Sequence, residues 1–324
     1  MKNIKKEILF ILATISLNLF LNNGVYSMKK ENPYGTYLGK QIKYKFANKQ
    51  RLKLNHIFQI IKNKNINDKK HFIDTTTKQI SHRIYKQITQ TLNEFKLIKN
   101  KFNISNFKKE LNNYIKQIFN SFLNSDSKTL NLFPTIKCNC INSENSFIYT
   151  GPLYLIQKII FNIANTNQNI DLYEINKLKN ILIQELIISL VKEISMYVPI
   201  EILNISYNEL TELPIKLLYV LKDYCPYLKK IDFSENNIIE IPDEISLLQG
   251  LEVINAHRNG VFCKIPTNEI LKLTKLKWFL HPEYSQNITR GEYSIDFSNF
   301  KTRLNNLTDA NRQKNPDPVC RRLF

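Results

Sequence analysis

The sequence predicts a chain of two parts: an N-terminal bundle of helices, followed by a short α/β solenoid. Parallel strands would line the concave side of the solenoid, with helices or loops on its convex side. Apolar residues recur every three or four positions from about residue 50 to 124, which is the spacing of helices that bury one face. From residue 200 onward, another pattern returns three times in register, and this indicates stacked units.

The composition limits the classes of function. The chain has 324 residues, of which 43% are hydrophobic, enough for a folded core. Its seven glycines are few for an enzyme with several glycine-rich phosphate loops. Residues 28–197 hold 27 basic and 11 acidic side chains, which is +16 of the total charge of +18. This excess indicates an acidic partner for the helical part, unless a codon usage favouring Lys, Asn and Ile explains it.

The N-terminus has the pattern of a secretory signal peptide. Lys2, Lys5 and Lys6 precede an apolar stretch over residues 8–21, and residues 25–27 fit a cleavage site. We therefore expect residues 1–27 to be a signal peptide and the protein to be secreted or periplasmic. Two alternatives are an uncleaved segment that anchors the protein to a membrane, and a true start at Met28.

The helical part is predicted to extend over residues 28–150 as a basic domain. Residues 125–150 break the helical periodicity and are predicted to form a loop or a short strand pair. Helices are expected again at about 152–165 and 171–197, within a segment (151–199) that caps the region after it. The helix over 171–197 is apolar nearly all round its middle, so we expect it to be buried.

The repeated pattern begins at residue 200. Residues 200–214 have apolar side chains at relative positions 1, 4, 6, 11 and 14, Asn at position 9 and Pro at position 15. Residues 228–242 match at the same positions, residues 251–261 match again, and a partial fourth unit begins at Leu276. This pattern resembles the leucine-rich repeat family, L-x-x-L-x-L-x-x-N-x-L followed by L-P. The resemblance covers about residues 200–281.

The spacing and the resemblance together imply the local structure. Positions 4 and 6 lie on one face of a short strand and point into the core. The Asn side chain at position 9 bonds to backbone groups inside the turn, which makes Asn208, Asn236 and Asn259 a structural ladder. The segment over 215–227 is expected to be a helix. Stacked units need caps at both ends, and residues 282–324 would form the C-terminal cap and tail.

The family commonly binds another protein through the concave face of its strands. The resemblance therefore implies non-enzymatic protein–protein interaction. With the N-terminal pattern, we expect an exported, effector-like bacterial protein. The side chains that we expect on this face are Asn204, Ser206, Tyr207, Lys230, Asp232, Ser234, Glu235, Asn255, His257, Arg258 and Trp278.

The sequence offers little catalytic chemistry. It contains no H-E-x-x-H, G-x-S-x-G, P-loop or G-x-G-x-x-G pattern. The predicted function includes no catalytic residue, cofactor, metal or small-molecule substrate, and an enzyme in the helical part is a lesser alternative. The disulfide state of the cysteines is left open; they are Cys138, Cys140, Cys225, Cys263 and Cys320.

A second hypothesis concerns the lysines of the helical part. They cluster on or between the early helices, where a basic surface suits nucleic acid or an anionic membrane. The alternative is a solvated lysine face without a ligand. The clustered side chains are Lys62, Lys64, Lys69, Lys70, Lys96, Lys99, Lys101, Lys108 and Lys109.

Overall fold

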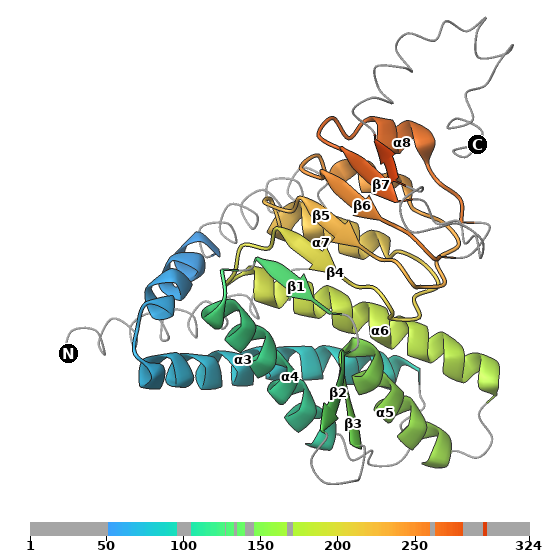
Figure 1. Cartoon of the computed structure of the whole chain (residues 1–324). Helices are drawn as coiled ribbons and strands as arrows, with labels where there is room; N and C mark the ends of the chain where they lie inside the picture. Colours follow the sequence, from blue (N-terminus) through green and yellow to red (C-terminus); the bar gives the residue numbers. More distant parts are fainter. Residues whose placement is uncertain are drawn as a thin grey trace, which may run out of the picture. The chain divides into compact units, whose positions relative to one another are not determined.

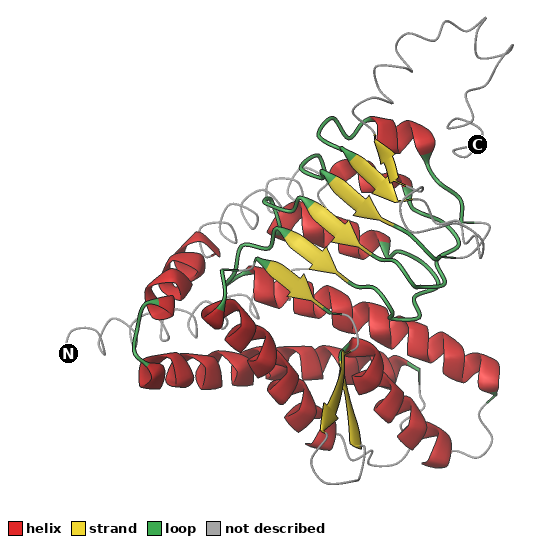
Figure 2. Cartoon of the chain, viewed as in Figure 1, coloured by secondary structure: helices red, strands yellow, loops and turns green. Residues whose placement is uncertain are grey.

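The structure is a computed structural model that describes residues 51–95, 105–126, 128–132, 135–139, 146–166, 171–259, 263–280 and 294–296. The predicted signal peptide and most of the predicted C-terminal tail lie outside these ranges, as do three of the clustered lysines (Lys96, Lys99 and Lys101). The described residues form a mixed α/β structure, in which helices accompany a largely parallel sheet (Figure 1 and Figure 2).

Helices make up most of the first part of the chain, as their apolar spacing predicted. The residues over 51–62 are helical, and the longer helices are α3 (Ile66–Glu94), α4 (Ser105–Asn124), α5 (Pro152–Thr166) and α6 (Leu172–Ser195). The Asn65 side chain caps α3 by accepting a hydrogen bond from the amide of Asp68. All residues over 186–191 of α6 are buried, which confirms the prediction for this helix.

The sheet contains six strands in the order β1-β4-β5-β6-β7-β8. The first five run parallel, and β8 (Ser294–Asp296) pairs antiparallel with β7. The parallel strands are β1 (Thr129–Asn131), β4 (Ile202–Asn204), β5 (Lys230–Asp232), β6 (Val253–Asn255) and β7 (Trp278–Leu280).

Short helical segments connect the parallel strands. The predicted helix after β4 is present as α7 (Ile215–Tyr224). The next connection holds a 3₁₀ helix, η2 (Asp243–Leu247), and the one after it holds α8 (Thr267–Leu271). Each of the three has a proline as its N-cap residue, without a capping hydrogen bond from a side chain.

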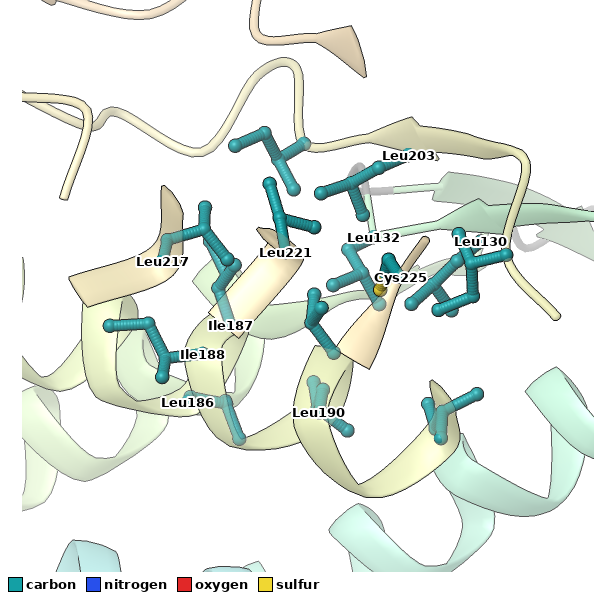
Figure 3. Close-up of a cluster of buried hydrophobic side chains, with 14 of the residues drawn as sticks. Leu130, Leu132, Leu186, Ile187, Ile188, Leu190, Leu203, Leu217, Leu221 and Cys225 are labelled. Carbon is teal, nitrogen blue, oxygen red and sulfur yellow. The ribbon is translucent and has the colours of Figure 1, made fainter. Parts of the chain in front are cut away.

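One hydrophobic layer lies between the sheet and the helices α6 and α7. The pairing places Leu203, Ile231, Ile254 and Phe279 side by side on four neighbouring strands, and each of them is buried. Figure 3 shows the part of this layer in which Leu203 lies with side chains of α6 and α7. Because side chains alternate along a strand, the residues on either side of each buried one point to the opposite face.

The segment over 125–150 contains more structure than a loop. It forms the predicted strand pair, β2 (Thr135–Asn139) and β3 (Ser146–Thr150), which are antiparallel. Strand β1, which pairs with β4 at the edge of the large sheet, was not expected from the sequence pattern. Leu130 and Leu132 are both fully buried, and their spacing of two residues matches that of Leu203 and Ile205.

The helical part and the sheet share a single hydrophobic core, with buried residues from Phe58 to Phe279. Arg51 joins the two parts directly, because its guanidinium donates hydrogen bonds to the carbonyls of Asp223 and Tyr224 at 3.1 and 3.0 Å. These carbonyls belong to the last turn of α7, where acceptors lack partners within the helix. A buried arginine therefore holds the C-terminal end of α7.

Candidate functional site

The side chains of the parallel strands that point away from α6 and α7 form what we call the outer strand face. Strand pairing arranges them in two rows across the sheet. The rows, in strand order, are Thr129, Ile202, Lys230, Val253 and Trp278, and then Asn131, Asn204, Asp232, Asn255 and Leu280. Neighbouring strands are about 4.8 Å apart, so each row is a continuous line of side chains.

The first row combines apolar side chains with one cation. Ile202 and Val253 are half-buried, and Lys230 is exposed. Trp278 is 42% exposed and is the only tryptophan of the chain. A large aromatic side chain that remains this exposed on a rigid strand is a typical anchor for a protein partner.

The second row is polar except for Leu280, and hydrogen bonds fix the orientation of its central side chains. The Asn204 Oδ1 atom accepts from the amide and the hydroxyl of Ser206, at 3.0 and 2.8 Å. The Asp232 Oδ1 atom accepts from the same two groups of Ser234, at 3.0 and 2.7 Å. Both serines are buried, and the Asn204 and Asp232 side chains that accept their hydrogen bonds cap the strand ends. That these serines contact a partner stays a prediction.

Two further members of the predicted site continue this arrangement. The Asn255 Nδ2 atom donates to Asp232 Oδ2 at 2.9 Å, and Asn255 Oδ1 accepts from the amide of His257 at 3.1 Å. The carboxylate of Asp232 thus holds both its own strand end and the neighbouring strand. This makes Asp232 part of the framework of the face, and a poor position for a test of partner contacts.

Three turn residues, which follow β4, β5 and β6, form one border of the outer strand face. Tyr207, Glu235 and Arg258 have φ values of 58°, 54° and 52°, a left-handed conformation that is uncommon for residues with a side chain. Arg258 pairs with Glu235 at 2.5 Å. Burial raises the pKa of Tyr207, and the nearby Glu235 carboxylate adds to the effect. Tyr207 is nevertheless 52% exposed, so it can contact a partner.

Each of these three turn residues is followed by a buried asparagine, which holds the turn rigid. Asn236 Nδ2 donates to the carbonyls of Ile205, Phe233 and Ser234, and its Oδ1 accepts from the amides of Asn208 and Leu210. Asn208 and Asn259 make corresponding bonds in the turns on either side. Each amide side chain therefore joins its own turn to a neighbouring one.

Alternating charges lie just before the strands. Glu201 accepts from Lys128 and from Lys229, and Glu252 pairs with Lys277 at 2.8 Å. The two lysines beside Glu201 lower the pKa of its carboxyl group. Sequence reasoning missed this row, although the alternating signs at equivalent positions were a usable signal. The charges neutralise one another and reinforce the strand order.

The described residues offer few groups suited to metal binding or to thiol reactions. No group of three or more His, Cys, Asp or Glu side chains there is close enough to hold a metal ion. Cys225 and Cys263 are free thiols, and burial raises their pKa values to about 12 and about 11. Both are therefore protonated, and weakly nucleophilic, at neutral pH. The side chain of Cys138, and all of Cys140 and Cys320, lie outside the description.

A pocket of about 440 Å³ lies between α4 and α5. Phe107, Ile159 and Phe161 supply apolar walls, and Glu110 and Lys158 supply the charges. Those two charged groups pair with each other at 2.7 Å, and the Lys158 ammonium also lies 4.5 Å from the centre of the Tyr154 ring. The pocket therefore presents no unmatched charge, and we regard it as a weaker candidate than the outer strand face.

No protein-family model and no curated protein matches the chain. In the part of the chain that the structure describes, no helix combines the length and the apolar character needed to cross a bilayer.

Proposed function

We propose that residues 200–281 form a leucine-rich repeat array and that the protein acts by binding another protein, without catalysis, through the outer strand face. The repeat assignment is supported by three features that recur at the same position in successive units. These are a buried strand residue, a residue with positive φ, and a buried asparagine bonded to backbone carbonyls.

The binding role rests chiefly on one observation: the largest aromatic side chains of the outer strand face remain exposed. Tyr207 and Trp278 are 52% and 42% exposed, although the strands beneath them are rigid and well packed. Exposed aromatic groups on a preformed surface lose little conformational entropy on binding. Lys230 and Arg258 add charged groups of the kind that give an interface its specificity.

The experiment compares partner binding by two double variants of the full chain. In Tyr207→Ala with Trp278→Ala, we expect affinity for an identified partner to fall at least about 30-fold, since each residue is predicted to be a hot spot worth about 1–2 kcal/mol. The matched control is Tyr173→Ala with Tyr219→Ala, which removes aromatics of similar exposure, 69% and 48%, from α6 and α7. Equal losses in both variants would contradict the proposal.

The single tryptophan provides a direct readout. Because Trp278 is the only one in the chain, its fluorescence reports on the outer strand face alone when the partner contains no tryptophan. We expect the emission to shift to shorter wavelength on binding, because the indole leaves water. A partner that binds with no change in Trp278 emission or quencher access would place the interface elsewhere.

Export through a signal peptide at residues 1–27 is part of the same proposal. It rests on the basic start, the apolar stretch and the small-residue site in the sequence. N-terminal sequencing of the protein recovered outside the cytoplasm would test it. A chain that begins at Gly24 to Lys30 argues against an uncleaved anchor, and an intact Met1 outside the cytoplasm favours one.

A further inference from the structure

The described helices that precede β1 carry an excess of positive charge, and this charge lies outside the outer strand face. The ranges 51–95 and 105–126 contain twelve basic and five acidic side chains, a net charge of +7. Several acidic groups are already neutralised, since Asp126 pairs with Lys62 and Glu110 pairs with Lys158. The remaining lysines therefore determine the local potential.

The first half of α3 carries three lysines, Lys69, Lys70 and Lys78, together with two carboxylates, Asp68 and Asp74. Asp74 lies one helical turn from both Lys70 and Lys78, and Lys116 of α4 pairs with it at 2.6 Å. Three ammonium groups thus surround one carboxylate. The hydrogen bond from Lys116 lowers the pKa of Asp74, and the charges of Lys116, Lys70 and Lys78 add to the effect. Lys70 and Lys78 are exposed, so this net positive charge faces water.

The turn that leads into α3 adds exposed apolar groups to these lysines. Ile66, the first residue of α3, is 82% exposed, and Ile60, in the last turn of the preceding helix, is 44% exposed. Lys64 lies between them, and Lys69 and Lys70 follow within one turn. With this exposure, the two isoleucines contribute little to the described core. Together with the lysines they match the interface of a bilayer, where apolar groups enter and cations meet headgroups.

We propose that the N-terminal corner of α3, formed by Ile60, Ile66, Lys64, Lys70 and Lys78, binds the surface of an anionic lipid bilayer. This site is separate from the outer strand face and does not depend on the function proposed for it.

Two observations favour a lipid surface over nucleic acid. The large exposed apolar side chains of the described helices before the sheet are aliphatic (Leu52, Ile60 and Ile66), whereas binding to unpaired bases uses aromatic stacking. The Tyr85 ring on α3 is already covered by the Lys108 ammonium, 5.6 Å from its centre. The cationic groups at the corner are lysines, which lack the forked geometry that arginine offers to phosphates.

The test measures partition of the full chain onto vesicles of phosphatidylserine and phosphatidylcholine, against vesicles of phosphatidylcholine alone. Neutralising Lys70→Gln with Lys78→Gln should lower partition onto the anionic vesicles by about 30-fold, if each lysine contributes the usual amount near such a surface. The matched control is Lys177→Gln with Lys222→Gln, which removes the same charge from exposed positions on α6 and α7. Because every variant keeps residues 1–50, any contribution of the apolar N-terminal stretch cancels.

A second pair of variants tests the apolar contact. Ile66→Ser should weaken partition, whereas Ile239→Ser, at a similarly exposed isoleucine (67%) in a loop, should not. Equal partition onto neutral and anionic vesicles, or equal loss in the two lysine variants, would overturn the proposal. So would a lysine variant that loses affinity for duplex DNA but keeps its affinity for anionic vesicles. The variant lacking Tyr207 and Trp278 should bind vesicles normally, which separates this site from the proposed protein interface.

Discussion

Replacing Asn236 with alanine tests whether the buried asparagines hold the turns of the proposed repeat array together. The side chain donates to three carbonyls and accepts from two amides. Its two N–H groups can donate at most two good hydrogen bonds at once. With the two that its Oδ1 atom accepts, the substitution removes about four hydrogen bonds. At about 1 kcal/mol for each, the free energy of unfolding should fall by about 4 kcal/mol.

The same count predicts an order among the three asparagines. Asn259 makes two donor bonds and one acceptor bond, so its replacement should cost about 3 kcal/mol. Asn208 donates to three carbonyls, but its Oδ1 has no partner among the described residues, so about 2 kcal/mol is expected. The predicted order of destabilisation is therefore Asn236, then Asn259, then Asn208.

Urea denaturation followed by circular dichroism measures these differences, and the Trp278 emission gives a second probe close to the turns. Asn113→Ala is the matched control, because Asn113 is an exposed asparagine on α4 and surface changes are usually within about 0.5 kcal/mol. If Asn236→Ala were no more destabilising than the control, the proposed role of the ladder would be refuted. An unchanged denaturant slope is required for the comparison, since a change in slope indicates loss of two-state behaviour.

Two further predictions address the edge of the sheet and its charges. Leu130→Ala should lower the free energy of unfolding by about 2–5 kcal/mol, because Leu130 is fully buried on β1. The control is Leu52→Ala, at a position 57% exposed, which should change the free energy of unfolding little. Equal effects of the two substitutions would mean that β1 does not belong to the core. Glu201→Gln should cost about 0.5 kcal/mol at neutral pH, as for a surface ion pair. The folded-state pKa of Glu201 lies below its usual value of 4.5, so this difference should be present above that pH and shrink as the pH falls through the folded-state value. A constant difference down to pH 2 would contradict the ion-pair explanation.

Local patterns predicted the helices and most of the parallel strands. The apolar spacing of α3 and α4 is a property of neighbouring turns, and it is visible in the sequence without knowledge of any partner helix. The same is true of Leu203 and Ile205, whose alternation identifies one buried strand face. The asparagine positions could be predicted because each one recurs at the same place in its unit, and each bonds to carbonyls of its own turn as well as to a neighbouring turn.

Contacts between distant segments could not be predicted in this way. The sequence alone determined that strands and helices form and which side of each is apolar. Only the tertiary structure decided that β1 joins the sheet and that Arg51 holds the end of α7. The physical reason is that periodicity reports how a segment divides its side chains between core and solvent. It does not report which segment, seventy or more residues away, supplies the other half of each contact.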